Sequence, residues 1–151
     1  MAGGIKFPGN ISATDSVQTP TFILDYIKDN YGEAFDPCPY IENFDLETHQ
    51  NGLMIPWKDL NYVNPPFSAA YRWVMKAYKE WKDHNKKTII LGKAYWLSRN
   101  YLMKIMHDIS VIVVGRTVFK GYNSKSRFCV ILIMIGFEKG KLSLLPPSSA
   151  L

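Results

Sequence analysis

The chain has 151 residues, of which 47% are hydrophobic, and it carries a formal net charge of +5. This length predicts one domain with a substantial core. The sequence has no apolar run of 18 residues and no charged start followed by an apolar segment, so we expect neither a membrane helix nor a signal peptide. Cys38 and Cys129 lie far apart and are expected to be free thiols in a reducing cytoplasm, and with the three histidines they show no metal-ligand spacing. The basic balance is compatible with a nucleic-acid partner.

The N-terminal part of the sequence predicts an arm followed by a helix. Residues 1–18 contain several glycines and little periodicity, so we expect a flexible arm, and residues 19–151 are expected to form the single folded domain. Thr19 is expected to cap the first helix, with Pro20 at its first position. Apolar residues at helical spacing continue from there to Tyr31.

Two loops that follow short strands are the first candidates for a binding site. A strand at residues 34–35 runs into Asp36-Pro37-Cys38-Pro39, and a strand that ends at residue 63 runs into Asn64-Pro65-Pro66-Phe67. The segment between them looks irregular and contains a turn signal at Asn51-Gly52. The carboxyl ends of parallel strands meet at one edge of a sheet, where α/β folds bind ligands. We therefore expect the two loops to face one ligand.

The rest of the sequence predicts alternating helices and strands. Hydrophobic periodicity indicates, in chain order, a helix from Ser68 as cap to about residue 83, a strand at 87–91, a helix at 96–107, a strand at 109–114, and a hairpin of Val118-Phe119 with residues 128–137. This order predicts an α/β fold with one mostly parallel, Rossmann-like sheet. Helices are expected on both faces of the sheet, with an antiparallel C-terminal hairpin at its edge.

The turn Asn64-Pro65-Pro66-Phe67 presents an amide, a carbonyl and an aromatic ring from a stiff loop. The side-chain oxygen of Asn64 and the carbonyl of Pro65 are expected to accept both hydrogens of an exocyclic amino group. Two such acceptors stabilise the positive charge that the nitrogen gains when it attacks a methyl donor. Phe67 is expected to stack on a base that has been taken out of a helix. A purely structural strand-to-helix turn explains the same four residues equally well.

Two groups of basic residues are candidates for nucleic-acid binding. The lysines of the predicted helix at 68–83 are more simply explained as its solvated face. The loop between residues 115 and 127 mixes basic residues with glycine, asparagine and an aromatic residue, which fits phosphate contacts as well as it fits a solvated loop. The candidates in this loop are Arg116, Lys120, Tyr122, Lys125 and Arg127.

In their order and spacing, these motifs resemble the small phage-type DNA N6-adenine methyltransferases, the Dam-like family. The resemblance extends over residues 19–137. The matching features are Thr19-Pro20, Phe35-Asp36-Pro37-Cys38, Asn51-Gly52-Leu53 with Trp57, Asn64-Pro65-Pro66-Phe67 with Trp73 and Lys76-Ala77, Gly115-Arg116 with Phe119, and the closing apolar strand to Gly136.

The resemblance implies a site-specific enzyme in the cytoplasm of a bacterial host. It implies that the enzyme transfers a methyl group from S-adenosylmethionine to the N6 amino group of a flipped adenine in duplex DNA, without a metal. The implied catalytic residues are Asn64, Pro65, Pro66 and Phe67. The implied cofactor-binding residues are Thr19, Pro20, Asp36, Pro37, Cys38, Asn51 and Asn64, with Asp45 and Glu47 as candidates for the ribose of the donor.

Two alternative functions stay open from the sequence. The same kind of turn serves enzymes that methylate RNA or a protein glutamine. A degenerate relative that only binds nucleic acid or a partner is the other alternative. It is favoured by Pro39-Tyr40-Ile41, which stands where many amino-methyltransferases have a glycine-rich cofactor turn.

Overall fold

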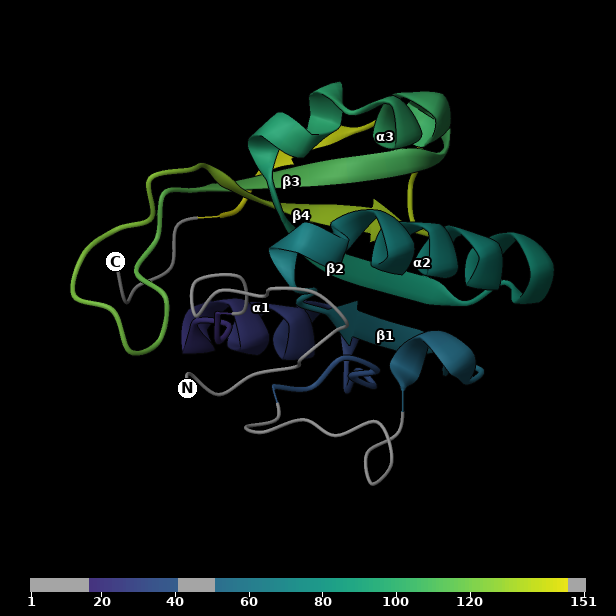
Figure 1. Ribbon diagram of the computed structural model, residues 1–151, viewed down its shortest axis with the longest axis horizontal. Coiled ribbons are helices and arrows are strands. Elements are labelled where there is room, and N and C mark those ends of the chain that lie inside the picture. The colour runs from purple at the N-terminus through teal and green to yellow at the C-terminus, as the bar shows by residue number, and fades with distance from the viewer. Residues whose placement is uncertain (1–16, 41–50, 147–151) are drawn as a thin grey trace.

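The computed structural model describes residues 17–40 and 51–146. The predicted arm up to residue 16, and the ribose candidates Asp45 and Glu47, lie outside the described residues. The helices are α1 (Thr21–Tyr31), α2 (Ala70–His84) and α3 (Asn100–Ile105), and 3-10 turns are η1 (Gly52–Met54), η2 (Phe67–Ala69), η3 (Ala94–Ser98) and η4 (Met106–Asp108). The strands are β1 (Leu60–Val63), β2 (Lys87–Lys93), β3 (Ile109–Gly115), β4 (Val130–Ile135) and β5 (Leu142–Leu144), as shown in Figure 1.

The five strands form one mixed sheet in the order β1-β2-β4-β3-β5. The pairs β1–β2 and β3–β5 are parallel, whereas β4 pairs antiparallel with both β2 and β3. The prediction of a mostly parallel sheet is therefore wrong. The alternation of strands and helices correctly indicated a common direction for β1, β2 and β3, but it gave no sign that β4 would insert between β2 and β3.

The predicted hairpin exists, but with a different first strand. β4 pairs with β3 along its length, from Ile109 opposite Ile135 to Gly115 opposite Val130. The proposed partner Val118-Phe119 lies in the connecting loop, where Phe119 is buried in the core. The backbone N–H and C=O groups of a buried central strand need partners along its whole length, and β3 supplies them where two residues cannot. Strand β5, which was not predicted, is short and exposes Leu142 and Leu144 at the edge of the sheet.

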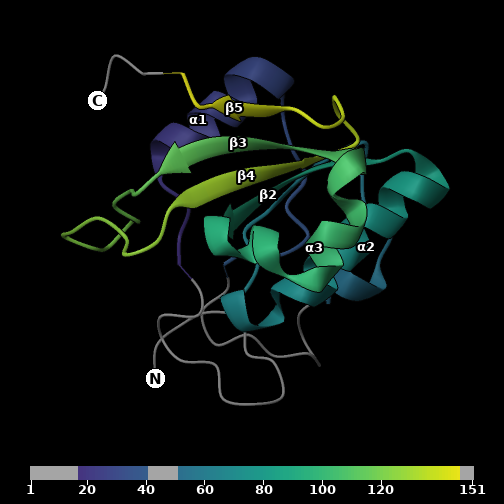
Figure 2. The ribbon, with the colours of Figure 1, turned by 90° about the horizontal axis from the view of Figure 1, so that it is seen from above.

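Helices cover both faces of the sheet, as predicted (Figure 2). On one face, α1 buries Ile23 and Ile27 in a cluster with side chains of β1, β2 and β4. On the other face, α2 and α3 bury Trp73 and Leu102 in a second cluster. Successive strand residues point to opposite faces, which explains why Ile89 belongs to the first cluster and Ile90 to the second.

The first two predicted helices start one residue later than expected, and the third starts four residues later. Pro20, not Thr19, stands at the N-cap of α1, so the hydroxyl of Thr19 is available for other contacts. Ser68 lies inside η2, and α2 begins at Ala70. The predicted helix at 96–107 is α-helical only in α3 and is flanked by the turns η3 and η4.

The expectation that both candidate loops share one edge of the sheet is confirmed. Phe35 forms a parallel bridge with Asn61 of β1, in which its N–H donates to the carbonyl of Leu60 at 2.9 Å. Residues 36–39 therefore leave the sheet beside residues 64–67. The β3–β4 loop starts at this edge too and projects well beyond the sheet (Figure 1). Within the described part of the chain, no helix has the length and apolarity needed to cross a membrane.

Candidate active site

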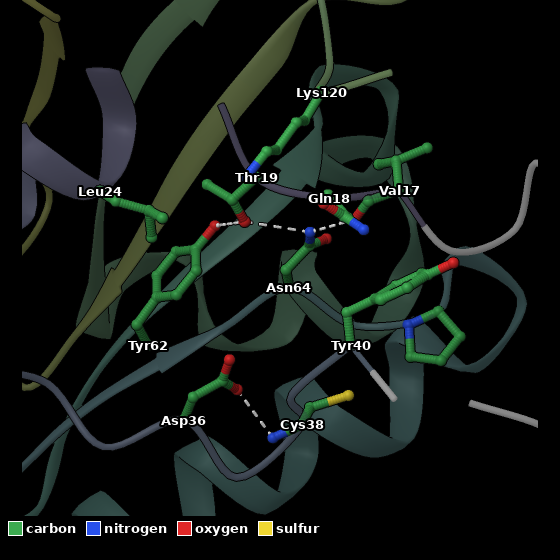
Figure 3. A pocket seen from close by; sticks show the side chains of 11 residues that line it. Val17, Gln18, Thr19, Leu24, Asp36, Cys38, Tyr40, Tyr62, Asn64 and Lys120 are labelled. Carbon is green, nitrogen blue, oxygen red and sulfur yellow. Dashed lines mark hydrogen bonds between the residues drawn. The ribbon is translucent and has the colours of Figure 1, made fainter. Parts of the chain in front are cut away.

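A cavity of about 290 Å³ opens at the edge of the sheet where the two loops meet (Figure 3). Its lining combines the start of α1, the loop after residue 35, the end of β1 and the β3–β4 loop. Four of the residues predicted to bind a cofactor lie on it, together with one predicted nucleic-acid contact and one proline of the turn. These are Thr19, Asp36, Cys38 and Asn64, then Lys120 and Pro66.

The side chain of Asn64 is held in one orientation by the segment before α1. Its Nδ2 donates hydrogen bonds to the carbonyl of Val17 at 2.5 Å and to Oγ1 of Thr19 at 3.1 Å. These contacts use both amide hydrogens, whereas Oδ1 takes part in neither of them. This oxygen is buried and has no hydrogen-bond partner among the described residues. A buried acceptor without a partner costs roughly 1–3 kcal/mol, so this oxygen is open to a donor that the described residues do not supply.

Tyr62 also helps to position Asn64, through Thr19, although the sequence did not identify it as a site residue. It is buried, and its hydroxyl lies 2.7 Å from Oγ1 of Thr19, where either oxygen can be the donor. Burial raises the pKa of Tyr62, so the hydroxyl stays protonated at neutral pH. The sequence did contain a hint of this role. Tyr62 precedes Asn64 by two residues, and residues two apart along an extended chain lie on the same side. No sequence pattern predicted the hydrogen bond between Asn64 and the carbonyl of Val17.

Asp36 contributes a carboxylate to the same cavity. Its side chain is exposed because it faces the opening, and its Oδ1 accepts a hydrogen bond from the N–H of Cys38 at 2.9 Å. The surrounding protein atoms nevertheless raise the pKa of Asp36 to about 6 by desolvation, which the hydrogen bond only partly opposes. Cys38 is a free, buried thiol whose pKa is raised by burial, so it is not suited to act as a nucleophile.

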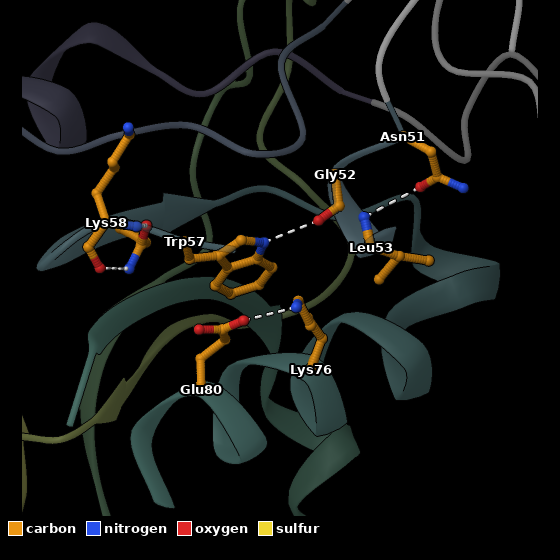
Figure 4. Close-up of polar contacts among 8 residues, drawn as sticks. Asn51, Gly52, Leu53, Trp57, Lys58, Lys76 and Glu80 are labelled. Atoms are coloured by element: carbon orange, nitrogen blue, oxygen red, sulfur yellow. Dashed lines mark hydrogen bonds and ion pairs between the residues drawn. The ribbon is translucent and has the colours of Figure 1, made fainter. Parts of the chain in front are cut away.

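Five of the residues predicted for catalysis or cofactor binding lie outside the described lining of this cavity, namely Pro20, Pro37, Asn51, Pro65 and Phe67. Phe67 has contacts of its own, described below. Pro20 caps α1, and Pro65 is a buried residue of the turn. Asn51 uses its Oδ1 to accept the N–H of Leu53 at 3.0 Å at the start of η1 (Figure 4). Pro37 directs its carbonyl at Gly52. In the described contacts these residues shape the loops, and their direct roles toward a ligand stay predictions.

The ring of Phe67 lies in an aromatic cluster with a cation over it. Its centroid is 6.0 Å from that of Trp96 and 5.6 Å from that of Phe128. The Nζ of Lys93 lies 4.1 Å from the Phe67 centroid and 4.4 Å from the Phe128 centroid. The sequence reading missed Lys93. The available signal was a lysine at the carboxyl end of a buried parallel strand, at the same edge as the two loops.

A second cavity of about 340 Å³ lies between this cluster and the β3–β4 loop. Phe67 and Lys93 line one side of it. Three of the predicted nucleic-acid contacts, Tyr122, Lys125 and Arg127, line the other.

Arg116 has a different place, because its Nε donates to the carbonyl of Ser126 at 2.6 Å and so helps to close the base of the loop. The N–H of Ser126 donates in turn to the carbonyl of Thr117 at 2.7 Å. Among the described residues, no group of three or more His, Cys, Asp or Glu side chains is placed to hold a metal ion.

The chain matches a protein family and part of a viral protein. The family described as DNA N-6-adenine-methyltransferase (Dam) matches residues 10–139, which is most of the chain. The "Uncharacterized protein 1070" of Sulfolobus islandicus rod-shaped virus 1 is 33% identical over 72 residues, which are 46% of this chain. The matched segment spans only 7% of the length of that viral protein.

Proposed function

The chain belongs to the DNA N-6-adenine-methyltransferase family, and from this premise we propose that it transfers a methyl group from S-adenosylmethionine to the N6 amino group of adenine in DNA. The observation that carries the proposal is the buried Oδ1 of Asn64, which has no partner among the described residues while both hydrogens of its amide are occupied. The amide is fixed as an acceptor. An adenine amino group is the matching donor.

The charged side chains that line the first cavity are complementary to the charged groups of the methyl donor. Asp36 and Lys120 both line it, so a carboxylate and an ammonium are available to the amino, carboxylate and ribose groups of an amino-acid-bearing nucleoside. Its volume of about 290 Å³ lies near the lower end of small-molecule sites. When bound, the donor supplies an electrophilic methyl group on a positively charged sulfur. Asp36, Thr19 and Lys120 are the residues that we propose hold it.

The chain's own contribution to the reaction is orientation and electrostatic stabilisation. The Oδ1 of Asn64 and the carbonyl of Pro65 accept the hydrogens of the adenine amino group and favour the positive charge that develops on its nitrogen. Val17 and Thr19 keep the amide from rotating, so this geometry exists before the substrate arrives. No protein nucleophile is required.

The target base is proposed to enter the second cavity and stack on Phe67 after it leaves the helix. The base can take the ring face only if the ammonium of Lys93 moves aside from it. Tyr122, Lys125 and Arg127 would then face the DNA from the loop, with Lys120 and Arg116 nearby in sequence. We propose that this loop gives the site preference of the enzyme, and that the mixed sheet is a variant of the Rossmann-like methyltransferase arrangement.

The direct test is transfer of labelled methyl from S-adenosylmethionine to unmethylated duplex DNA, with RNA and a glutamine-containing protein as parallel acceptors. We expect the label in adenine of DNA. Label only in RNA or in the protein would replace the proposed acceptor with that one. Binding of the donor without transfer to any acceptor would contradict the catalytic proposal, and absence of donor binding would favour a binding-only relative.

The pH dependence of donor binding tests the role of Asp36. Because desolvation raises its pKa to about 6, Asp36 is protonated in the free protein below that pH and ionised above it. We expect the affinity for S-adenosylmethionine to fall as the pH is lowered through 6, since the neutral carboxyl loses its attraction for the positively charged donor. Isothermal titration calorimetry between about pH 5 and pH 8 measures this change around that pKa.

The variant Asp36→Asn is the control for this titration. It should bind the donor weakly at all pH values and lose the step near pH 6. The effect of Asp36 on folding is opposite to its effect on donor binding. Because the pKa of Asp36 is higher in the folded protein than in the unfolded chain, the free energy of unfolding falls as the pH rises from the ordinary pKa of an aspartate to about 6. Asp36→Asn should therefore not lower the Tm at neutral pH. A wild-type affinity that is flat across this range would contradict the assignment.

A further inference from the structure

A groove on the face of the sheet that α2 and α3 cover is distinct from the two cavities. It has a volume of about 900 Å³ and is lined by α2 on one side and by η3 and α3 on the other. Phe67 and Lys93 line both this groove and the second cavity. The groove therefore adjoins the proposed active site, and Trp96, which packs against Phe67, lines it as well.

The groove carries aromatic rings that are open to solvent. Tyr71 is 57% exposed and Tyr95 is 51% exposed. Tyr71 meets Tyr101 edge to face across the groove, with the ring centroids 5.2 Å apart. Exposed rings of this kind offer the surfaces on which the bases of an unpaired strand stack.

Positive charge surrounds these rings. Lys93, Arg99 and Lys104 line the groove, and among its described lining residues there is no Asp or Glu. Two of these cations lie close to the ring of Tyr95, since the guanidinium carbon of Arg99 and the Nζ of Lys93 are each 5.7 Å from its centroid. The combination of exposed rings with cations and without carboxylates is complementary to a polyanion that carries flat bases.

We propose that this groove binds a single-stranded nucleic-acid segment that flanks the target base. Its bases stack on Tyr95, Tyr71 and Tyr101, and its phosphates face Lys93, Arg99 and Lys104. The inference rests on the proposed function, because a base that is taken out of the helix at Phe67 brings the adjoining strand to the groove that Phe67 also lines.

Binding of a single strand can be measured without the methyl donor. The probe is a fluorescent thymidine oligonucleotide of about 12 nucleotides, a length within the range that single-strand grooves occupy, and the readout is fluorescence anisotropy. Tyr95→Ala should weaken the affinity roughly 5- to 150-fold, which corresponds to the loss of one stacking platform. Tyr95→Phe keeps the ring and should bind like the wild type.

The charged residues give a second, independent readout. The double variant Arg99→Gln with Lys104→Gln should weaken binding and reduce the slope of log Kd against log salt by about 1.4, because each phosphate contact on a single strand contributes about 0.7. Lys79→Gln is the matched control. Lys79 is an exposed lysine of α2 that lies outside the lining of the groove, so this change should leave the affinity and the slope near their wild-type values.

The outcomes separate this inference from the proposed function. Unchanged binding by Tyr95→Ala, an equal loss in Tyr95→Phe, or no oligonucleotide binding by the wild type would overturn the groove assignment even if methyl transfer to duplex DNA is observed. Loss of binding in Tyr95→Ala alone supports it even if no methyl transfer is found. A uridine oligonucleotide of the same length decides the source of the strand, since tighter binding to it would assign the groove to RNA.

Discussion

Replacing Asn64 by alanine should lower the single-turnover rate of methyl transfer by at least about 10²- to 10³-fold, the usual loss when one preorganised polar group at a reacting centre is removed. The reason is that Oδ1 of Asn64 is the acceptor that the fold holds in place, with its amide fixed by Val17 and Thr19. Methyl transfer to duplex DNA measures the effect. A rate within a few-fold of the wild type would show that Asn64 is not catalytic.

The same change should alter stability little, which separates catalysis from folding. Two hydrogen bonds of about 1 kcal/mol each are lost, but removal of a buried oxygen without a partner returns roughly 1–3 kcal/mol. The two contributions nearly cancel. Thermal unfolding of Asn64→Ala should therefore give a Tm close to that of the wild type.

Asn61→Ala is the matched control and should behave in the opposite way. Asn61 is fully buried in β1, only three residues before Asn64, and the hydrogen bonds that its side chain makes with the described residues all go to backbone groups. Its Oδ1 accepts the N–H of Lys58, and its Nδ2 donates to the carbonyls of Lys58 and Lys87. Its loss should lower the free energy of unfolding by at least about 2 kcal/mol. The transfer rate per folded molecule should stay near the wild-type value.

The second large effect on stability and binding is expected at Gly52, which packs against the loop that follows residue 35. A Cβ at this position would lie 1.8 Å from the carbonyl oxygen of Pro37 and 3.1 Å from the ring of Trp73. The carbonyl of Gly52 also accepts the indole N–H of Trp57 at 2.8 Å, which fixes η1 against the core (Figure 4). Gly52→Ala must therefore displace backbone, and the displaced segment is the one that carries Asp36 and Cys38 into the first cavity.

Gly52→Ala should lower the free energy of unfolding by about 3 kcal/mol, the upper part of the range for overpacking, and the Tm by roughly 6–12 °C for a domain of this size. Affinity for S-adenosylmethionine should fall as well, because the loop with Asp36 moves. Thermal unfolding and calorimetry measure the two effects. Met54→Ala is the control, since Met54 is in the same 3-10 turn but 80% exposed. Wild-type values of both quantities in Gly52→Ala would mean that the loop adapts without consequence.

Several parts of this architecture could be predicted because they depend on neighbouring residues. Strand alternation and helical periodicity located the core segments, since the side-chain period of each element is local. The two prolines after Asn64 fix the turn by their own rings. The direction of β1, β2 and β3 followed from their alternation with helices. The loops at 36–39 and 64–67 were correctly expected to share an edge because each follows a strand segment, and these segments run parallel where Phe35 bridges Asn61.

The errors have a common physical cause. The position of β4 depends on which strand can pair with its backbone along its whole length, and β3 does so where the two residues Val118-Phe119 cannot. The same applies to the helix starts. Thr19 is placed by its contact with Tyr62 and Asn64, more than 40 residues away in sequence, and not by the preference of a threonine for the N-cap.

The sequence by itself determined the family, the stiff turn at Asn64, and the set of loops from which a site is built, because these reside in residue identity and local conformation. Only the tertiary structure decided how the site works. The orientation of the Asn64 amide comes from Val17 and Thr19, which are 47 and 45 residues away in the chain. The cation over Phe67, the close approach of Gly52 to Pro37, and the aromatic groove between α2 and α3 likewise arise from contacts between distant segments. Such contacts depend on packing, and packing is not encoded in any single stretch.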